Sequence, residues 1–253
     1  SDSIFRIEPK TIQVYGPGFG EDLARGYSYN INWTSNFGGF VKIELLQNGT
    51  PQFPAISDST DNDGSFSWTI PAGTAIGSTY KIRITHLVDP VSAESANNFS
   101  INDPRITLTN PNGGQEIVRG SSQSINWSTN YDGNGSVKIE LLNNGTPLAP
   151  AITDSTPNNG FFSWSVPAAS VAGTQYRIRI TSLDTAAADD SNADFSVIAH
   201  SVTMISPNGA EEFSVGTTKS LQWNSNFGGT SSVKLELLKA GAPVLEIAAT
   251  ASN

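Results

Sequence analysis

The stretch NINWTSN (residues 30–36) occurs three times in this chain, with SINWSTN at 124–130 and SLQWNSN at 220–226. Ile31 and Trp33 stand two positions apart, so in an extended strand their side chains lie on one face. The polar residues between them lie on the other face. The alternation predicts a half-buried β-strand. It also raises the question of whether the repeated indole fills a core or is displayed to a ligand such as a sugar.

The repetition extends well beyond this stretch. The three tryptophans, Trp33, Trp127 and Trp223, stand 94 and 96 residues apart. The segment VKIELL at 41–46 occurs again at 137–142 and, as VKLELL, at 233–238, and both of these spacings are 96 residues. The two-residue difference falls in one loop, where FGGF (37–40) is replaced by YDGNGS (131–136). A period near 96 residues matches a whole small domain rather than one turn of a solenoid.

Each unit is predicted to consist of strands. Val41, Ile43 and Leu45 alternate with charged residues, and the pair Asn48-Gly49 is typical of a hairpin turn that needs positive φ. About seven short strands in roughly 96 residues indicate an immunoglobulin-like sandwich. Tyr80 stands two residues before a predicted buried position, which is the spacing of a tyrosine corner. We therefore expect an all-β protein of tandem immunoglobulin-like β-sandwiches, with Tyr176 repeating the corner.

The period divides the chain into four parts. Residues 1–9 resemble the closing strand of a preceding repeat, 10–103 and 104–199 are two complete domains, and 200–253 correspond to the N-terminal half of a third. We expect the two complete domains to superpose, with the largest deviation at 36–41 against 130–137. With Asn253 aligned to Pro157, the third copy lacks the counterparts of the FSW, YxIRI and closing strands.

Two explanations remain open for the third copy. Either the chain is a segment of a longer array of repeats, or neighbouring molecules complete the open sheet by donating residues 1–7 as a strand. Both predict that residues 1–7 are extended and paired with a sheet.

Composition excludes several functions. Lys and Arg number 14 and Asp and Glu 23, which gives a net charge of −9, and no basic run is present. We therefore expect no nucleic-acid partner, because phosphate binding needs clustered cations. No apolar stretch approaches the roughly 18 residues of a membrane span. The absence of cysteine excludes disulfides and thiolate chemistry.

The tryptophans are predicted to be core residues. Every one occupies a position of the repeat and shares its face with apolar neighbours, as Trp164 does with Phe162 and Val166. We therefore expect Trp33, Trp127 and Trp223 to be almost fully buried, with Trp68 and Trp164 packed nearby. A sugar platform, under the carbohydrate-binding alternative, would use the exposed aromatics outside the repeat: Tyr15, Tyr27, Tyr29 and Tyr131.

The order of these motifs resembles a known family. A Pro-x-Gly turn (111–113), a glycine at 120, the I-x-W strand, VKIELL, FSW, Y-x-I-R-I and a closing DFSV (194–197) follow one another. This order is similar to the immunoglobulin-like domain of the yeast cell-wall β-1,6-glucan synthesis proteins and the Ser/Thr-rich GPI-anchored surface proteins, also found in bacterial and archaeal surface proteins. The resemblance implies the fold and a place outside the cell, and it transfers no catalytic residue.

Few residues suggest chemistry. His86 and His200 are the only histidines, and no Ser-His-Asp arrangement is present, so we expect no enzyme and no cofactor. Asp58, Asp61 and Asp63 have a spacing that suits Ca²⁺, although the second copy replaces two of them with Pro and Asn. Six sequons are candidate N-glycosylation sites, which would make the chain a glycoprotein: Asn32, Asn48, Asn98, Asn126, Asn134 and Asn144.

These features favour a non-catalytic, extracellular structural protein of the cell surface or cell wall. The linkers at 101–105 and 197–201 are short and are not Gly/Ser tethers, so neighbouring domains should form a semi-rigid stalk, filament, adhesin shaft or surface layer. The expected partners are neighbouring copies or other surface proteins. The alternative is a carbohydrate-binding accessory module of a secreted enzyme or adhesin, with cell-wall glycan as its ligand.

Overall fold

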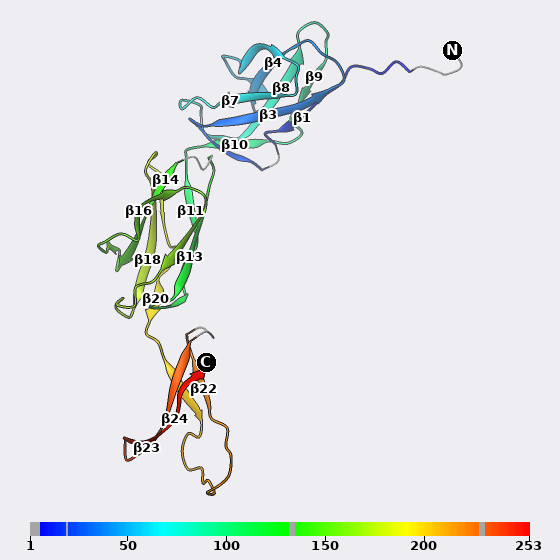
Figure 1. Cartoon of the computed structure of the whole chain (residues 1–253). Helices are drawn as coiled ribbons and strands as arrows, with labels where there is room; N and C mark the ends of the chain where they lie inside the picture. The colour runs from blue at the N-terminus through cyan, green and yellow to red at the C-terminus, as the bar shows by residue number, and fades with distance from the viewer. Residues whose placement is uncertain (1–5, 19, 132–134, 228–230) are drawn as a thin grey trace.

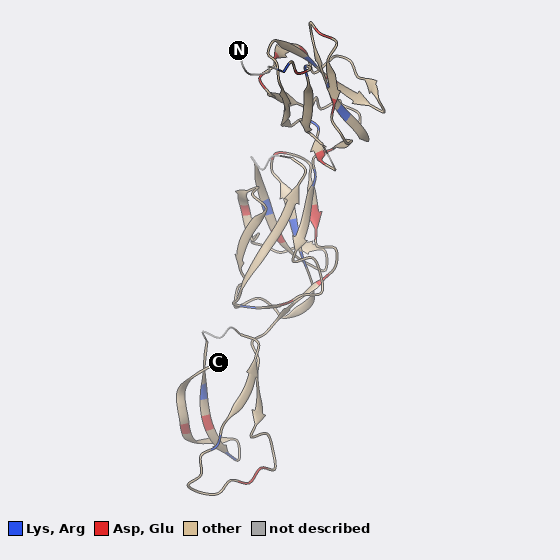
Figure 2. Cartoon of the chain, turned by 90° about the vertical axis from the view of Figure 1, so that its right-hand side faces the viewer, with Lys and Arg blue, Asp and Glu red and all other residues tan. Residues whose placement is uncertain are grey.

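The computed structural model describes residues 6–18, 20–131, 135–227 and 231–253. Every regular element in these residues is a strand. The described residues contain no helix long and apolar enough to cross a membrane. Figure 1 shows three β bodies placed end to end along the chain, each corresponding to one copy of the sequence repeat. Lys and Arg lie close to Asp and Glu along the strands (Figure 2), as in the pairs Lys42–Glu44 and Lys138–Glu140.

The first repeat is a sandwich of two sheets. One sheet has the order β1-β3-β7, and the other has the order β2-β10-β8-β4-β5, with β6 paired to β4 and β9 paired to β8. The strands are β1 (Ile12–Gly16), β2 (Asp22–Ala24), β3 (Ser28–Ser35), β4 (Phe40–Gln47), β5 (Thr50–Pro51), β6 (Ser57–Asp61), β7 (Ser65–Thr69), β8 (Gly77–His86), β9 (Ser92–Glu94) and β10 (Phe99–Asn102). The short strands β2, β5 and β9 extend the predicted set of about seven.

The second repeat has the same strands in the same order and with the same lengths. They are β11 (Ile106–Asn110), β12 (Glu116–Val118), β13 (Ser122–Thr129), β14 (Ser136–Asn143), β15 (Thr146–Pro147), β16 (Thr153–Pro157), β17 (Phe161–Ser165), β18 (Gly173–Ser182), β19 (Ala188–Asp190) and β20 (Phe195–Ile198). The offset between repeats changes from 94 to 96 residues between β3 and β4. The insertion therefore lies in the predicted loop, of which residues 132–134 are outside the described part.

The core of each sandwich follows from the alternation in the sequence. Val41 and Ile43 on β4 are fully buried, and Ile82 and Ile84 on the neighbouring β8 face the same interior. Trp33 and Trp68 are 3% and 5% exposed, and Trp127 and Trp164 are 5% and 4% exposed. The prediction that these four indoles fill the core is confirmed.

The predicted tyrosine corners and hairpin turns are also present. The hydroxyl of Tyr80 donates to the carbonyl of Ala75 at 2.6 Å, and that of Tyr176 donates to Val171 at 2.7 Å. Burial raises the pKa of the Tyr80 phenol. Asn48 and Asn144 adopt φ of 50° and 49°, the left-handed conformation that a tight turn before glycine requires.

The third repeat is more open than the other two. It comprises β21 (Val202–Ser206) paired with β22 (Gln222–Ser225), and β23 (Ser232–Lys239) paired with β24 (Ala242–Ser252). Trp223 is only half-buried, so the expectation of an almost fully buried indole is wrong for this copy. In repeats 1 and 2 the equivalent indole shares a core cluster with residues of β7 and β8 or their counterparts, such as Trp68 and Tyr80. The described part of repeat 3 does not include these strands.

Two further expectations concern the ends of the sequence. The Nε1 of Trp223 donates to the side chain of Asn253 at 3.1 Å, as Trp127 donates to Asn158 at 2.7 Å. Asn253 therefore corresponds to Asn158 and not to Pro157, because the segment 243–248 within β24 is one residue shorter than its counterpart 147–153. The predicted strand at 1–7 falls mostly outside the described residues, and Ile7 is unpaired and 85% exposed.

Candidate functional site

An asparagine clamp fixes the chain where it enters each repeat. The side-chain amide of Asn130 donates to the carbonyl of Asp103 at 3.0 Å, and its oxygen accepts from the backbone N–H of Arg105 at 2.8 Å. Both ends of one carboxamide thus hold a three-residue segment of the linker. Asn36 binds Pro9 and Thr11 in the same way, and Asn226 binds Ala199 and Ser201.

These asparagines were missed as functional residues by sequence reasoning. They are the last letters of NINWTSN, SINWSTN and SLQWNSN, so the repetition was visible. Nothing local showed that the side chain turns back to the linker, because the partners lie 25 and 27 residues earlier.

The junction between repeats 1 and 2 contains a shared apolar core. Ala24 of β2 is fully buried among core residues of the second repeat, and Tyr27 packs against the same cluster. The rings of Tyr27 and Tyr131 lie 4.6 Å apart at an angle of 34°. Burial is the main cause that raises the pKa of Tyr27, and the nearby Tyr131 and Asp184 raise this pKa further.

Hydrogen bonds close the same junction. The backbone carbonyl of Asn130 accepts from the N–H of Ala24 at 3.1 Å and from the hydroxyl of Tyr29 at 2.8 Å. Arg105 forms an ion pair with Asp22 across the junction. Packing, hydrogen bonds and charge therefore all fix the orientation of the second repeat on the first.

The junction between repeats 2 and 3 has fewer contacts among the described residues. The positions of Tyr27 and Tyr29 are occupied by Ser121 and Gln123 in repeat 2. The clamp of Asn226 is kept, and the ring of His200 contacts that of Phe227 at 5.5 Å in an edge-on arrangement.

The four tyrosines that the carbohydrate-binding alternative would use are mostly not exposed. Tyr131 is 7% exposed, and Tyr27 and Tyr29 are half-buried at the first junction. Only Tyr15 is open, at 55% exposure, and its hydroxyl is close to Thr34. Three of the four tyrosines are therefore covered at the first junction and do not form an exposed platform together with Tyr15.

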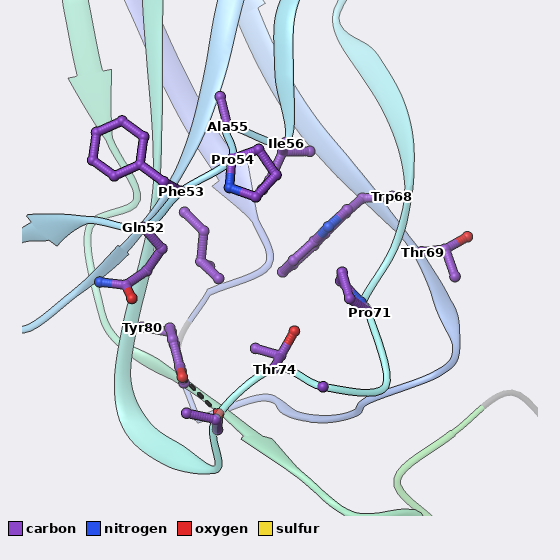
Figure 3. A pocket seen from close by; sticks show the side chains of 13 residues that line it. Gln52, Phe53, Pro54, Ala55, Ile56, Trp68, Thr69, Pro71, Thr74 and Tyr80 are labelled. Atoms are coloured by element: carbon purple, nitrogen blue, oxygen red, sulfur yellow. Dashed lines mark hydrogen bonds between the residues drawn. The ribbon is translucent and has the colours of Figure 1, made fainter.

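Each complete repeat carries a pocket at the open side of its sandwich. Figure 3 shows the pocket of repeat 1, about 410 Å³ in volume, with Trp68, Pro71 and Pro54 on one side and Tyr80 on the other. Phe53 points away from Trp68 in this view, and its side chain is 86% exposed. The pocket of repeat 2 has a volume of about 480 Å³ and matching residues, namely Leu141, Pro150, Ile152, Trp164 and Pro167.

The other candidate residues do not assemble into a catalytic or metal site. Asp58, Asp61 and Asp63 are exposed, and Asp63 accepts a hydrogen bond from the N–H of Ser65. No three metal-ligating side chains gather anywhere in the described ranges, so the Ca²⁺ site stays a prediction without structural support. His86 is buried, and its Nδ1 accepts from the N–H of Asp89 at 3.0 Å.

The sequons differ in accessibility. Asn32, Asn48, Asn98 and Asn144 are exposed, Asn126 is half-buried, and Asn134 lies outside the described residues. Glycosylation at these positions stays a prediction.

The fold and the junctions define a tandem immunoglobulin-like protein. A family model, the Kre9/KNH-like N-terminal Ig-like domain, matches residues 16–101 and again 110–196. The chain therefore belongs to the Kre9/KNH-like family, with two copies of its domain, and this family is associated with cell-wall proteins. A comparison with curated proteins gives no match.

Solved structures of several modular proteins are similar to this chain. The fibronectin(III)-like modules of Clostridium thermocellum CbhA are 20% identical, cover 75% of this chain and 95% of their own, and give a TM-score of 0.26. A chimeric titin Z1Z2 is 14% identical, covers 76% of this chain and 99% of its own, and gives a TM-score of 0.34. Bacteroides ovatus SGBP-B, solved with a mixed-linkage heptasaccharide, is 14% identical and gives a TM-score of 0.32. The match covers 75% of this chain and 46% of SGBP-B.

Proposed function

We propose that this protein is a non-catalytic, extracellular structural protein whose tandem immunoglobulin-like repeats form a semi-rigid rod. The rod would serve as a cell-surface stalk, filament, adhesin shaft or part of a surface layer. The observation that carries the proposal is the first junction, where Ala24 of one repeat is buried in the core of the next. A flexible tether between independent domains would not need such a contact.

Two further features support the proposal. The asparagine clamp occurs at all three repeat entries, so the segment preceding each repeat is held in one conformation. The family is associated with cell-wall proteins, which agrees with a place outside the cell. Neighbouring copies or other surface proteins are the partners that such a rod would contact.

The test measures the distance between repeats in solution. The chain has no cysteine, so Ser59→Cys and Ser155→Cys, both at exposed positions, place one spin label on each complete repeat. Pulsed electron paramagnetic resonance should give a single narrow distance distribution. A broad distribution, as for a freely jointed pair, would contradict the rod.

Glycan binding is the competing function. The four indoles of the complete repeats are buried, which leaves few aromatic faces for a sugar. Retention of the full chain on insoluble β-glucan, lost on addition of soluble oligosaccharide, would replace the structural proposal with a carbohydrate-binding one.

A further inference from the structure

The strands β7 and β17 are uncovered edges of their sheets. β7 pairs with β3 alone among the described strands, and β17 pairs with β13 alone. The preceding strand β6 joins the opposite sheet by pairing with β4. The open side of the sandwich therefore lies next to β7, and the same holds for β17.

The hydrogen-bond pattern shows which backbone groups of β7 are available. The N–H of Trp33 donates to Gly64 at 3.0 Å and the N–H of Ile70 donates to Tyr27 at 2.9 Å. Because hydrogen-bonded and non-hydrogen-bonded pairs alternate along an antiparallel ladder, the N–H and C=O groups of Ser67 and Thr69 point away from β3. The N–H of Ser65 is already bound by Asp63.

The second repeat has the same arrangement. Trp127 donates to Gly160 at 3.1 Å and Val166 donates to Ser121 at 2.9 Å, so Ser163 and Ser165 present the outward groups.

Nothing in these strands protects the edge. Natural sheets block their edges with lysine, proline or a bulge. β7 carries Ser67 and Thr69 instead, and its register with β3 runs without a bulge. An extended chain could add to this edge without displacing any described strand.

The pocket of each repeat adjoins the same edge. Trp68 and Thr69 of β7 line the pocket of repeat 1, together with Pro54 and Ile56. Ser163, Trp164 and Ser165 are among the residues lining the pocket of repeat 2. The lining of both pockets contains no charged side chain, so an uncharged, apolar group is the complementary occupant.

A charge marks the other end of the edge in repeat 1. Asp63 is exposed two residues before β7, whereas repeat 2 has Asn159 at this position. With a rise of about 3.3 Å per residue, a strand along β7 would place residues about five or six positions apart beside Asp63 and beside the pocket. A cation at the first of these positions is complementary to the carboxylate.

We propose that β7 and β17 each bind an extended peptide by strand addition, with an apolar side chain of the peptide in the adjoining pocket. In repeat 1 a Lys or Arg of the peptide lies next to Asp63. The rod would thus hold partner proteins through exposed, extended segments. This inference does not depend on rigid coupling between repeats, because each edge and its pocket belong to one repeat.

The test uses the full chain and capped eight-residue peptides. One has the sequence KTVTVTLT and another the reverse order, so that both strand directions are sampled; matched peptides replace Leu with Glu. We expect one Leu peptide to bind, with slowed exchange of the amides of Ser67, Thr69, Ser163 and Ser165 in NMR spectra. The Glu peptide should bind at least tenfold more weakly. Failure of both Leu peptides to bind would overturn the proposal.

Substitutions in and next to β7 and β17 distinguish the contribution of the backbone to peptide binding from that of the side chains. Ser67→Pro with Ser163→Pro removes one outward N–H group from the middle of each edge and should weaken binding at least tenfold, whereas the control S67A with S163A should change it less than twofold. Asp63→Asn introduces the residue of repeat 2, whose side chain makes the equivalent bond to Phe161. It should weaken binding at repeat 1 about two- to fivefold at low salt and less at high salt.

A second measurement covers the case in which the proline variant does not fold. Two peptides N-methylated at odd or at even positions are compared, because only one set of N–H groups can face β7. Loss of binding by one of them supports the proposal, and equal binding by both overturns it. Dimerisation of the chain through β7, or displacement of the peptide by soluble β-glucan, would also overturn it.

Discussion

The two junctions between repeats share a linker length and a clamp but differ in packing. Between repeats 1 and 2, Ala24 and Tyr27 enter the neighbouring core and Tyr29 binds the clamp residue. Between repeats 2 and 3, the clamp is joined by the contact of His200 with Phe227. The comparison shows that the repeated residues determine where the chain enters a repeat, whereas non-repeated residues determine how firmly two repeats are held together.

The largest effect is expected from Ala24→Glu. The new carboxylate would lie in the core of repeat 2 without a partner, at a cost of at least about 3 kcal/mol unless the junction opens. We expect the distance distribution between spin-labelled repeats 1 and 2 to broaden and their calorimetric transitions to separate. The control is Val118→Glu, because Val118 is the counterpart of Ala24 in repeat 2 and is only half-buried. This substitution should change the second junction little. Equal effects of the two substitutions would remove the distinction between the junctions.

A smaller effect is expected when the tyrosines of the first junction are exchanged for their counterparts. Tyr27→Ser with Tyr29→Gln copies repeat 2 and should lower the stability of the junction by about 2–3 kcal/mol, because ring burial and a hydrogen bond are lost. Distance measurements should then give similar widths for both junctions. If the first junction stays narrow, the tyrosines are not the cause of the difference.

The clamp itself should matter less, and equally at both junctions. Asn130→Ala removes the side-chain bonds to Asp103 and Arg105, which we expect to cost about 1–2 kcal/mol. Hydrogen exchange of the Arg105 amide should accelerate. Asn226→Ala should accelerate the amide of Ser201 similarly; a change at only one junction would mean that the clamp is not a shared device.

The smallest effect is expected from alkaline pH. Burial raises the pKa of Tyr27 above the ordinary value of 10.0, so the neutral phenol is favoured in the closed junction. The stabilisation is fully present below pH 10 and is lost as the pH rises through the raised pKa. The first junction should therefore loosen above about pH 10, as small-angle scattering would show, and Tyr27→Phe should remove the response.

Much of the fold could be predicted because its signals are local and repeated. Alternation in VKIEL places Val41 and Ile43 inside, and the spacing before Ile82 identifies Tyr80 as a tyrosine corner. The burial of four indoles was predicted correctly for the same reason. The prediction for Trp223 was wrong because the repeat pattern records which face of a strand is apolar, whereas the exposure of the indole also depends on the neighbouring strands that pack against it.

The sequence by itself determined the repeat length, the immunoglobulin-like sandwich and the residues of each core. Those properties depend on neighbours within one repeat, and a periodic pattern records them directly. Only the tertiary structure decided that Tyr27 meets Tyr131, that Asn130 binds the linker, and that the outer edge of β7 has no partner among the described strands and lies beside a pocket. These arrangements join residues of different repeats or far along the chain, and whether a strand edge is covered depends on which sheet β6 joins, so no local pattern of residues encodes them.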